Sequence, residues 1–147
     1  EVDVVESGFK FHMNNITAAI GLSQIPHMDN IIKLHKVNGL LYEDLFSKVK
    51  NIKRLHYPIG SMPTFWVYTL ILSEHLNRDE IIQQLNDEGI NAGLVHTPSH
   101  NYTCFKDSMV DLPETDYFYG HQISLPCGWW LNESDIRLIA KSLISKL

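Results

Sequence analysis

Two histidines four residues apart are the first candidates for chemistry in this sequence. His96 and His100 have the i, i+4 spacing that places two imidazoles on one helix face, where they can bind a metal ion. Pro98 lies between them and favours a loop, and no Glu or Cys of that loop completes a ligand set. The pattern therefore predicts no metal site. The two imidazoles stay open to two interpretations, binding a ligand or anchoring the loop.

A lysine and a histidine precede the first predicted helix. Lys10 and His12 stand just before Asn14 and Asn15, either of which can cap the helix by accepting from its first amides. A cation and an imidazole near a helix N-terminus are suited to hold an anion. The alternatives are a solvated cation for Lys10 and a packed loop residue for His12.

The cysteines and the paired tryptophans favour no site. Cys104 and Cys127 have no base partner in the sequence that would activate them as nucleophiles. Trp129 and Trp130 precede the last predicted helix and are expected to pack on it, or on another domain, rather than stack on a sugar.

Composition narrows the class of protein. The chain has 147 residues, of which 44% are hydrophobic, which suits one domain with a core. Lys and Arg number 12 and Asp and Glu 17, so the net charge of 12 − 17 = −5 argues against nucleic acid as a partner. No apolar run could span a bilayer and no signal peptide is recognisable, so no membrane partner is expected. Two cysteines without a close pair fit reduced thiols and a cytoplasmic location.

The first third of the chain predicts two helices. Small or apolar residues recur at i, i+3, i+4 and i+7 from Ile16, which predicts a helix that ends near Ile25. Pro26 suits the first turn of a second helix, whose apolar positions continue at helical spacing to about Val49. This second helix is expected to brace the domain.

Two strands are predicted in the remainder. Residues 50–63 contain prolines and a glycine and predict a loop. Residues 64–72 are rich in β-branched and aromatic types and predict a central strand that is covered on both faces. Residues 90–96 are expected to form the next strand.

Capping residues mark two further helices. Asn77 is followed three residues later by Glu80, the pattern of a reciprocal capping box, and Gly89 suits the position just after that helix. Asn132 and Asp135 repeat the pattern before an apolar stripe that reaches the C-terminal residues.

Several of these segments, taken in order, resemble the DegT/DnrJ/EryC1/StrS family, whose members are pyridoxal-phosphate-dependent aminotransferases acting on nucleotide-linked keto-sugars. Residues 8–25 fit its pattern G-[YF]-[NK]-[YF]-x-[ML]-x-x-[IL]-x-A-A-[IL]-G-L-x-Q-[LI]. The other matching segments are Trp66, Arg78-Asp79-Glu80, Leu85-x-x-x-Gly89-Ile90, residues 96–105 and Ile123-Ser124-Leu125-Pro126.

The resemblance implies an α/β (α+β) fold, with a small and mainly antiparallel sheet covered by helices, as in the C-terminal domain of fold-type I aminotransferases. It covers only the later part of the family's sequence. We therefore expect residues 1–147 to form a single domain from the C-terminal part of a longer aminotransferase. Within it, residues 1–25 are expected to be a loop and helix on the dimer and cofactor side, residues 26–50 the long helix, and residues 64–147 the small α/β domain.

The resemblance also implies roles for four residues. The loop that holds Lys10 and His12 reaches across a dimer to the cofactor phosphate, although His12 follows neither common version of the family pattern. His96 and His100 border the sugar-nucleotide pocket, where an imidazole could hydrogen-bond a sugar hydroxyl or the diphosphate. The Schiff-base lysine and the carboxylate on the pyridine nitrogen lie upstream in the family. We therefore expect no catalytic residue here, and no pyridoxal phosphate on the chain alone.

Two functions are carried forward. The first is a homodimeric enzyme that moves an amino group from an amino acid, glutamate being the expected donor, to a nucleotide-linked keto-sugar for polysaccharide or lipopolysaccharide-type glycan biosynthesis. The second is a non-catalytic binding or dimerisation module derived from the same fold, with the small-residue face of the first helix as its interface.

Overall fold

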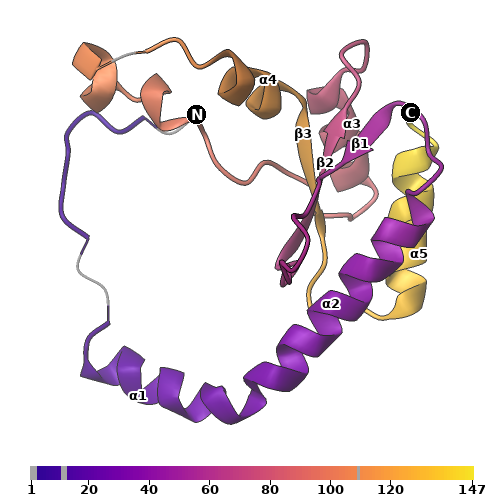
Figure 1. Ribbon diagram of the computed structural model, residues 1–147, viewed down its shortest axis with the longest axis horizontal. Helices are drawn as coiled ribbons and strands as arrows, with labels where there is room; N and C mark the ends of the chain where they lie inside the picture. The colour runs from indigo at the N-terminus through magenta and orange to yellow at the C-terminus, as the bar shows by residue number, and fades with distance from the viewer. Residues whose placement is uncertain (1–2, 11–12, 109) are drawn as a thin grey trace.

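A computed structural model describes residues 3–10, 13–108 and 110–147. Figure 1 shows an N-terminal arm, which comprises residues 3–10 and 13–27 and leads into one long helix. This helix lies along a body, made of a small sheet and several helices, that extends to residue 147. The elements in chain order are α1 (Asn15–Gln24), a 3₁₀ turn (Ile25–His27), α2 (Met28–Leu45), β1 (Ile52–Arg54), β2 (Val67–Leu72), α3 (Arg78–Asp87), two further 3₁₀ turns (Ser99–Asn101 and Thr103–Ser108), α4 (Pro113–His121), β3 (Gln122–Pro126) and α5 (Glu133–Ile144). Within the described ranges, none of the helices combines the length and apolar character that a membrane span requires.

The sheet is antiparallel, with its strands in the order β1-β2-β3. Its register places Leu70 of β2 opposite Ile123 of β3. Because side chains alternate along a strand, this register decides which residues share a face. Tyr68, Leu70 and Leu72 are buried on the inner face, whereas the residues between them are half-buried on the outer face. The fold of mixed helices and a small antiparallel sheet agrees with the sequence prediction.

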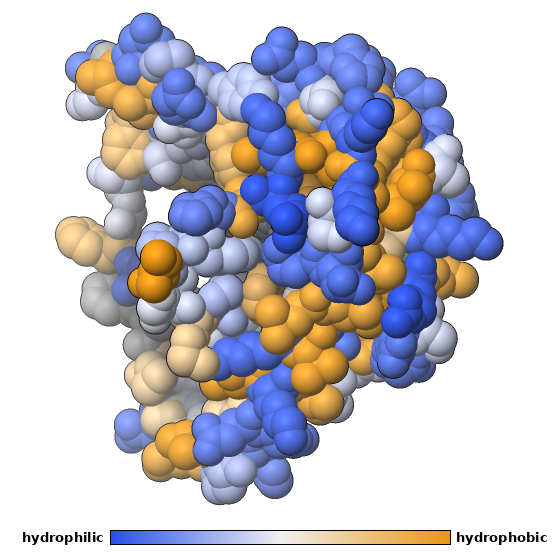
Figure 2. All heavy atoms as spheres, turned by 45° about the vertical axis from the view of Figure 1, so that its right-hand side comes forward, coloured by the Kyte–Doolittle hydropathy of each residue, from blue (hydrophilic) through white to orange (hydrophobic). Residues whose placement is uncertain are grey.

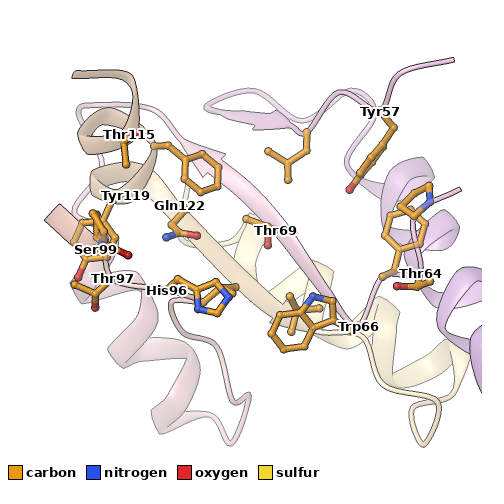
Figure 3. Close-up of a pocket in the computed structure, with 17 residues that line it drawn as sticks. Tyr57, Thr64, Trp66, Thr69, His96, Thr97, Ser99, Thr115, Tyr119 and Gln122 are labelled. Atoms are coloured by element: carbon orange, nitrogen blue, oxygen red, sulfur yellow. The ribbon is translucent and has the colours of Figure 1, made fainter. Parts of the chain in front are cut away.

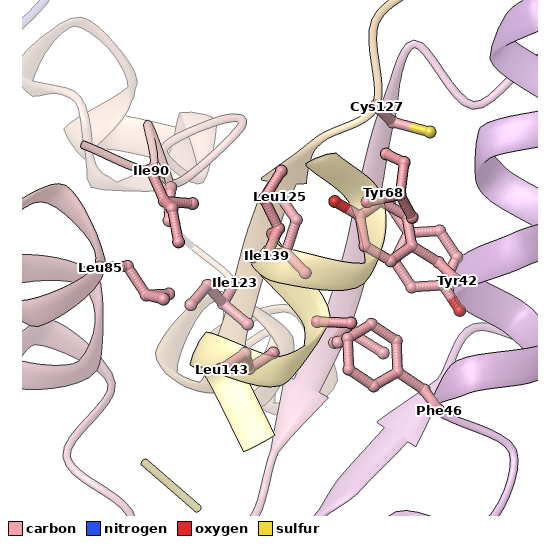
Figure 4. Packing of buried hydrophobic residues seen from close by; sticks show 14 of the residues in the cluster. Tyr42, Phe46, Tyr68, Leu85, Ile90, Ile123, Leu125, Cys127, Ile139 and Leu143 are labelled. Atoms are coloured by element: carbon pink, nitrogen blue, oxygen red, sulfur yellow. The ribbon is translucent and has the colours of Figure 1, made fainter. Parts of the chain in front are cut away.

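The core lies between the inner face of the sheet and the helices α2, α3 and α5 (Figure 4). Its most deeply buried side chains are Tyr42, Phe46, Tyr68, Leu70, Leu72, Leu85, Ile123, Leu125, Cys127, Ile136 and Leu143. The hydroxyl of Tyr42 donates to the carbonyl oxygen of Pro126 at 2.9 Å, so its buried polar atom is satisfied. Burial raises the pKa of the Cys127 thiol to about 12, which makes this cysteine a packing group.

One glycine lets the long helix approach the chain before β2. Gly39 lies inside α2, and a Cβ at this position would overlap the ring of Phe65. The neighbouring Asn38 is also buried, and its Nδ2 donates to the carbonyl oxygens of Gly128 at 2.9 Å and Leu131 at 3.2 Å. These contacts tie α2 to the segment before α5 as well as to the chain before β2.

The predicted helix caps are largely confirmed. Asn77 accepts from the backbone N–H of Glu80 at 3.2 Å, and Gly89 follows the helix with a φ of 81°, a conformation that glycine adopts readily. Asn132 and Asp135 form a complete capping box at α5. The prediction of a reciprocal capping box at α3 is wrong, because the Glu80 carboxylate accepts from the side chain of Gln84, one turn along the helix, and not from the backbone N–H of Asn77.

The strand and loop predictions need four corrections. The strand expected over residues 64–72 begins at Val67, because Phe65 has a left-handed φ of 53° that an extended strand cannot contain. Its outer face is only half-covered. The strand expected over residues 90–96 is reduced to one bridge between Gly93 and Ser124. The loop expected over residues 50–63 contains the short edge strand β1.

The N-terminal arm has little contact with the core. Asn14 caps α1 as predicted and accepts from the backbone N–H of Thr17 at 3.0 Å, but none of the residues of α1 is buried. The start of the arm is tied to the body where Asp3 accepts from the N–H of Thr103 at 3.0 Å. The apolar face predicted for this helix is thus left open to a partner.

Candidate functional site

A cavity of about 600 Å³ lies on the outer face of the sheet. Four segments surround it: the chain from Leu55 to Val67, the outer side of β2 and β3, residues 95–99, and α4. Figure 3 shows Gln122 and Thr69 between α4, which carries Tyr119, and the opposite wall, which carries Tyr57. This size is typical of small-molecule sites.

The floor of the cavity carries neutral hydrogen-bonding groups. The antiparallel register pairs Thr69 with Ser124 and Ile71 with Gln122, so all four side chains lie on the outer face. The hydroxyls of Thr69 and Ser124 are 2.9 Å apart and hydrogen-bonded. Gln122 is only 3% exposed although it lines the cavity.

The walls are aromatic. Tyr57, Phe65 and Trp66 form one wall, and α4 contributes Phe118 and Tyr119 to the other. The strained left-handed conformation of Phe65 is held by packing on α2, where the Nδ1 of His35 donates to its carbonyl oxygen at 3.0 Å. The turn at Phe65 leaves the next residue, Trp66, 62% exposed at the cavity. Burial, with a smaller contribution from Glu43, raises the pKa of Tyr57, which therefore stays a neutral hydroxyl.

An arginine on α3 holds α4 in place as a cavity wall. Arg78 donates through its Nη1 to the carbonyl oxygen of Tyr119, and its guanidinium lies 5.6 Å from the centroid of the Tyr119 ring. Its Nη2 also pairs with Asp79 at 2.7 Å. The motif Arg78-Asp79-Glu80 therefore has a structural consequence at the cavity, although Arg78 itself is not among the lining residues.

The two predicted substrate-site histidines occupy different places. His96 lines the cavity and is exposed. His100 lies outside the lining set, and its Nε2 is 2.9 Å from the carboxylate of Asp116 on α4. The side chain of His100 is only 13% exposed. The structure thus places His100 against α4 and His96 at the cavity, and substrate binding by either imidazole stays a prediction.

The two predicted cofactor-site residues are not brought to the cavity. Lys10 is exposed on the N-terminal arm and is not among the residues that line the cavity. His12 lies outside the described residues. Among the described residues, His, Cys, Asp and Glu form no group of three or more that could hold a metal ion.

Sequence reasoning missed Gln122 and Thr69 as site residues. Thr69 is a polar residue within an apolar run, and Gln122 directly precedes the Ile123-Ser124-Leu125-Pro126 segment. The available signal was the alternation of side chains between the two faces of each strand. It did not suffice, because the face on which a residue lies depends on how β2 and β3 pair.

Comparison with known proteins assigns the chain to a family. The sequence profile of the DegT/DnrJ/EryC1/StrS aminotransferase family matches residues 1–144. The GDP-perosamine synthase of Caulobacter vibrioides is 31% identical over 138 residues, which are 90% of this chain and 37% of that protein. The UDP-4-amino-4,6-dideoxy-N-acetyl-beta-L-altrosamine transaminase of Campylobacter jejuni is 23% identical over 158 residues, or 99% of this chain and 40% of that protein.

A solved structure gives the same assignment. The sugar aminotransferase CalS13 from Micromonospora echinospora superposes with a TM-score of 0.84 at 26% identity, over 95% of this chain and 37% of that one. The chain thus spans about two fifths of the length of the curated relatives it matches. With the profile covering almost every residue and the fold matching as well, this chain belongs to the DegT/DnrJ/EryC1/StrS aminotransferase family.

Proposed function

We propose that the chain acts as the C-terminal part of a pyridoxal-phosphate-dependent aminotransferase. The enzyme would transfer an amino group from an amino acid, glutamate being the expected donor, to a nucleotide-linked keto-sugar. The product would enter polysaccharide or lipopolysaccharide-type glycan biosynthesis. The observation that carries the proposal is the family match over residues 1–144, among whose relatives are a GDP-perosamine synthase and a UDP-sugar transaminase.

The residues of this chain do not fit covalent attachment of pyridoxal phosphate. When bound, this cofactor acts as an electron sink and needs a lysine for its Schiff base and a carboxylate at its ring nitrogen. All lysines of the chain lie in the described ranges, and none of them lines the cavity. Lys146, one of the least exposed, is held by Glu88 at 2.6 Å. This supports an attachment lysine outside the chain, so we assign no catalytic step to a residue of this chain.

The cavity on the outer face of the sheet is the proposed substrate site. His96 lines it and can donate to or accept from a sugar hydroxyl or a phosphate oxygen. His100 is proposed to act indirectly, by positioning His96. Its hydrogen bond to Asp116 fixes the loop that carries His96 against α4. The aromatic walls suit the ring faces of a sugar nucleotide.

A second copy of the chain is the proposed partner of the arm. The large apolar side chains of α1 and the following turn are exposed: Ile16, Ile20, Leu22 and Ile25. Figure 2 shows exposed apolar side chains among polar ones over the lower half of the molecule, where α1 and α2 lie. Lys10 and His12 would then reach the cofactor phosphate of the other subunit.

Both cysteines are free thiols, which supports a cytoplasmic location.

The alternative of a non-catalytic module rests on the same exposed helix. It predicts self-association without amino transfer, so catalysis separates the two functions. Size-exclusion chromatography with light scattering should show a dimer for the wild-type chain and a monomer for Ile20→Glu, which places a charge on the exposed apolar face. A wild-type monomer at all concentrations would count against both functions.

A direct test of the aminotransferase proposal is cofactor trapping. The chain is mixed with pyridoxal phosphate, reduced with borohydride and mapped by mass spectrometry. We expect no stoichiometric adduct on any lysine of this chain, and amino transfer from glutamate to a nucleotide-linked keto-sugar only when the chain is joined to the rest of an aminotransferase. Stoichiometric labelling of one lysine, above all Lys10, would overturn the proposal that the attachment lysine lies elsewhere.

A further inference from the structure

Two neighbouring aromatic side chains, Phe65 and Trp66, lie on the faces of the sheet opposite to those that strand alternation predicts. Tyr68 of β2 is on the inner face and Val67 on the outer face. An extended chain that runs back from β2 would therefore place Trp66 inside and Phe65 outside. In the structure Phe65 is 6% exposed, and its ring stacks on that of Tyr68 with 6.1 Å between the centroids. Trp66 instead lines the cavity beside Val67 (Figure 3).

The left-handed turn at Phe65 causes this exchange of faces. Its φ of 53° interrupts the extended backbone, so the regular alternation begins only at Val67, the first residue of β2. A positive φ in a bulky residue is strained and persists only where the surrounding contacts hold it. The place of Trp66 at the cavity therefore depends on the contacts that hold this turn.

A histidine of α2 forms a hydrogen bond to the turn. The Nδ1 of His35 lies 3.0 Å from the carbonyl oxygen of Phe65, thirty residues later in the chain. Because a carbonyl oxygen only accepts, Nδ1 carries the proton and donates it to this bond. The imidazole also packs edge-on against the ring of Trp130, with 6.4 Å between the centroids. Removing the donor would take away a bond that favours the turn over an extended backbone.

We propose that His35 is a positioning residue of the proposed substrate site, because its hydrogen bond to Phe65 decides which of two aromatic side chains faces the cavity. With the bond in place, Phe65 lies in the core and Trp66 at the cavity. Without it, the backbone relaxes toward the extended conformation, which moves Trp66 away from the cavity. The inference rests on the proposed function and deepens it, since His35 lies on α2, outside the residues that line the cavity.

Trp66 is the wall residue on which this positioning acts. An exposed indole offers a broad apolar face on which the ring of a bound ligand can pack. Moving Trp66 would remove this contact, whereas Thr69 and Ser124 would keep their places on the floor because they are paired in the β2–β3 ladder. Loss of the His35 bond should therefore weaken binding while the polar groups of the floor stay in place.

Packing also favours the turn, because the ring of Phe65 fills the space beside Gly39. Two substitutions of similar shape separate packing from the hydrogen bond. Asparagine keeps an N–H donor on an atom attached to Cγ, as Nδ1 is, whereas leucine has the same branching at Cγ and no donor. Both remove the ring contact with Trp130. The difference between His35→Asn and His35→Leu therefore reports the hydrogen bond.

Fluorine NMR of the chain labelled with fluorotryptophan tests the positioning. The chain has three tryptophans, and the Trp66 signal is the one that Trp66→Phe removes. His35→Asn should leave this signal at its wild-type position. His35→Leu should shift or split it, because the loss of one net hydrogen bond changes the ratio of two conformations by about fivefold. His75→Leu, at an exposed histidine of the turn after β2, is the matched control and should leave the signal unchanged.

A second variant without a donor, His35→Ala, should repeat the shift, so the test does not depend on one substitution. An unmoved Trp66 signal in His35→Leu and His35→Ala would overturn the proposal. Equal shifts in His35→Leu and His35→Asn would also overturn it, because they would show that the imidazole acts through packing alone.

Ligand binding distinguishes a failure of this inference from a failure of the proposed function. The probes are UDP-N-acetylglucosamine and GDP-mannose, one UDP-linked and one GDP-linked sugar, added to the joined enzyme. Their dissociation constants should rise in His35→Leu by the factor by which the fraction of Trp66 at the cavity falls, and His35→Asn should restore them. Unchanged constants beside a shifted Trp66 signal would refute the cavity as the substrate site and leave the positioning of Trp66 by His35 intact.

Discussion

Two helices of similar length, α1 and α5, have opposite relations to the rest of the molecule. None of the ten residues of α1 is buried, whereas α5 buries Ile136, Ile139, Ala140 and Leu143. Both helices begin with an asparagine cap, so their local signals are alike. The difference lies in what covers the apolar side chains, which is the core for α5 and solvent for α1.

This difference separates two kinds of stability. A helix as short as α1 is marginal in water on its own, because nucleation is costly and few hydrogen bonds repay it. The free energy of unfolding of this chain should therefore come from the body, and the arm should gain order from a partner. Paired substitutions in the body and in the arm test that separation.

Removing a core side chain should have the largest effect. Leu143→Ala in α5 deletes a fully buried side chain and should lower the free energy of unfolding by about 2 to 5 kcal/mol. Leu22→Ala in α1, where the side chain is 68% exposed, should change it by less than about 0.5 kcal/mol. Urea unfolding under conditions that keep the chain monomeric measures both. Equal effects would show that the arm belongs to the same folding unit as the body.

Two of the helical glycines, Gly39 and Gly21, should respond differently to alanine. Gly39→Ala in α2 would drive a methyl group into the ring of Phe65 and should destabilise the chain by about 1 to 3 kcal/mol. Gly21→Ala in α1 meets no atom within 4 Å, so it should only raise helix propensity. Circular dichroism should show more helix in Gly21→Ala, with an unchanged urea midpoint. A loss of helix there would contradict the open environment of α1.

Removing the N-cap of α5 and removing that of α1 should also have different effects, smaller than those of the core and glycine substitutions. Asn132→Ala removes the capping box of α5 and should cost about 0.5 to 2 kcal/mol of global stability. Asn14→Ala removes the cap of α1 and should speed hydrogen exchange in that helix while the urea midpoint stays the same. Matching shifts of the midpoint in the two variants would refute the separation.

Caps were predictable from the sequence because they depend on residues three positions apart. Asn77, Gly89 and Asn132 mark helix ends through contacts within one turn. The strand predicted over residues 90–96 failed because pairing is non-local. Within residues 90–96 only Gly93 forms a β-bridge, and its partner Ser124 lies about thirty residues later in the chain.

The site was predictable only where it lies on a loop with a recognisable motif. His96 was singled out from its segment, and the structure places it at the cavity, while its binding of substrate stays a prediction. Gln122 could not be identified, because its position on the outer face follows from its pairing with Ile71 in the β2–β3 register. The left-handed turn at Phe65 was equally invisible, since nothing local in an aromatic residue favours a positive φ.

Substitution of two exposed carboxylates, Glu88 in the body and Asp3 in the arm, should have the smallest effects on stability. The two effects should again differ between the body and the arm. In the body, the Glu88 carboxylate accepts from Lys146 at 2.6 Å and from Ser142, and these bonds lower its pKa below the usual value of 4.5. In the arm, the N–H of Thr103, followed by its hydroxyl, lowers the pKa of Asp3. Where the contacts of the carboxylate break only on global unfolding, a lowered pKa contributes to the free energy of unfolding above the unfolded-state pKa, and this contribution is lost as the pH falls through the folded-state value.

Glu88→Gln should therefore lower the urea midpoint slightly at pH 7, and the difference from the wild type should vanish once the pH is below the folded-state pKa of Glu88. Asp3→Asn should leave the midpoint unchanged at both pH values, because releasing the arm exposes no core. It should instead speed hydrogen exchange of the Thr103 amide, whose partner is Asp3. A pH-dependent midpoint in Asp3→Asn would mean that the arm contributes to global stability without a second copy of the chain.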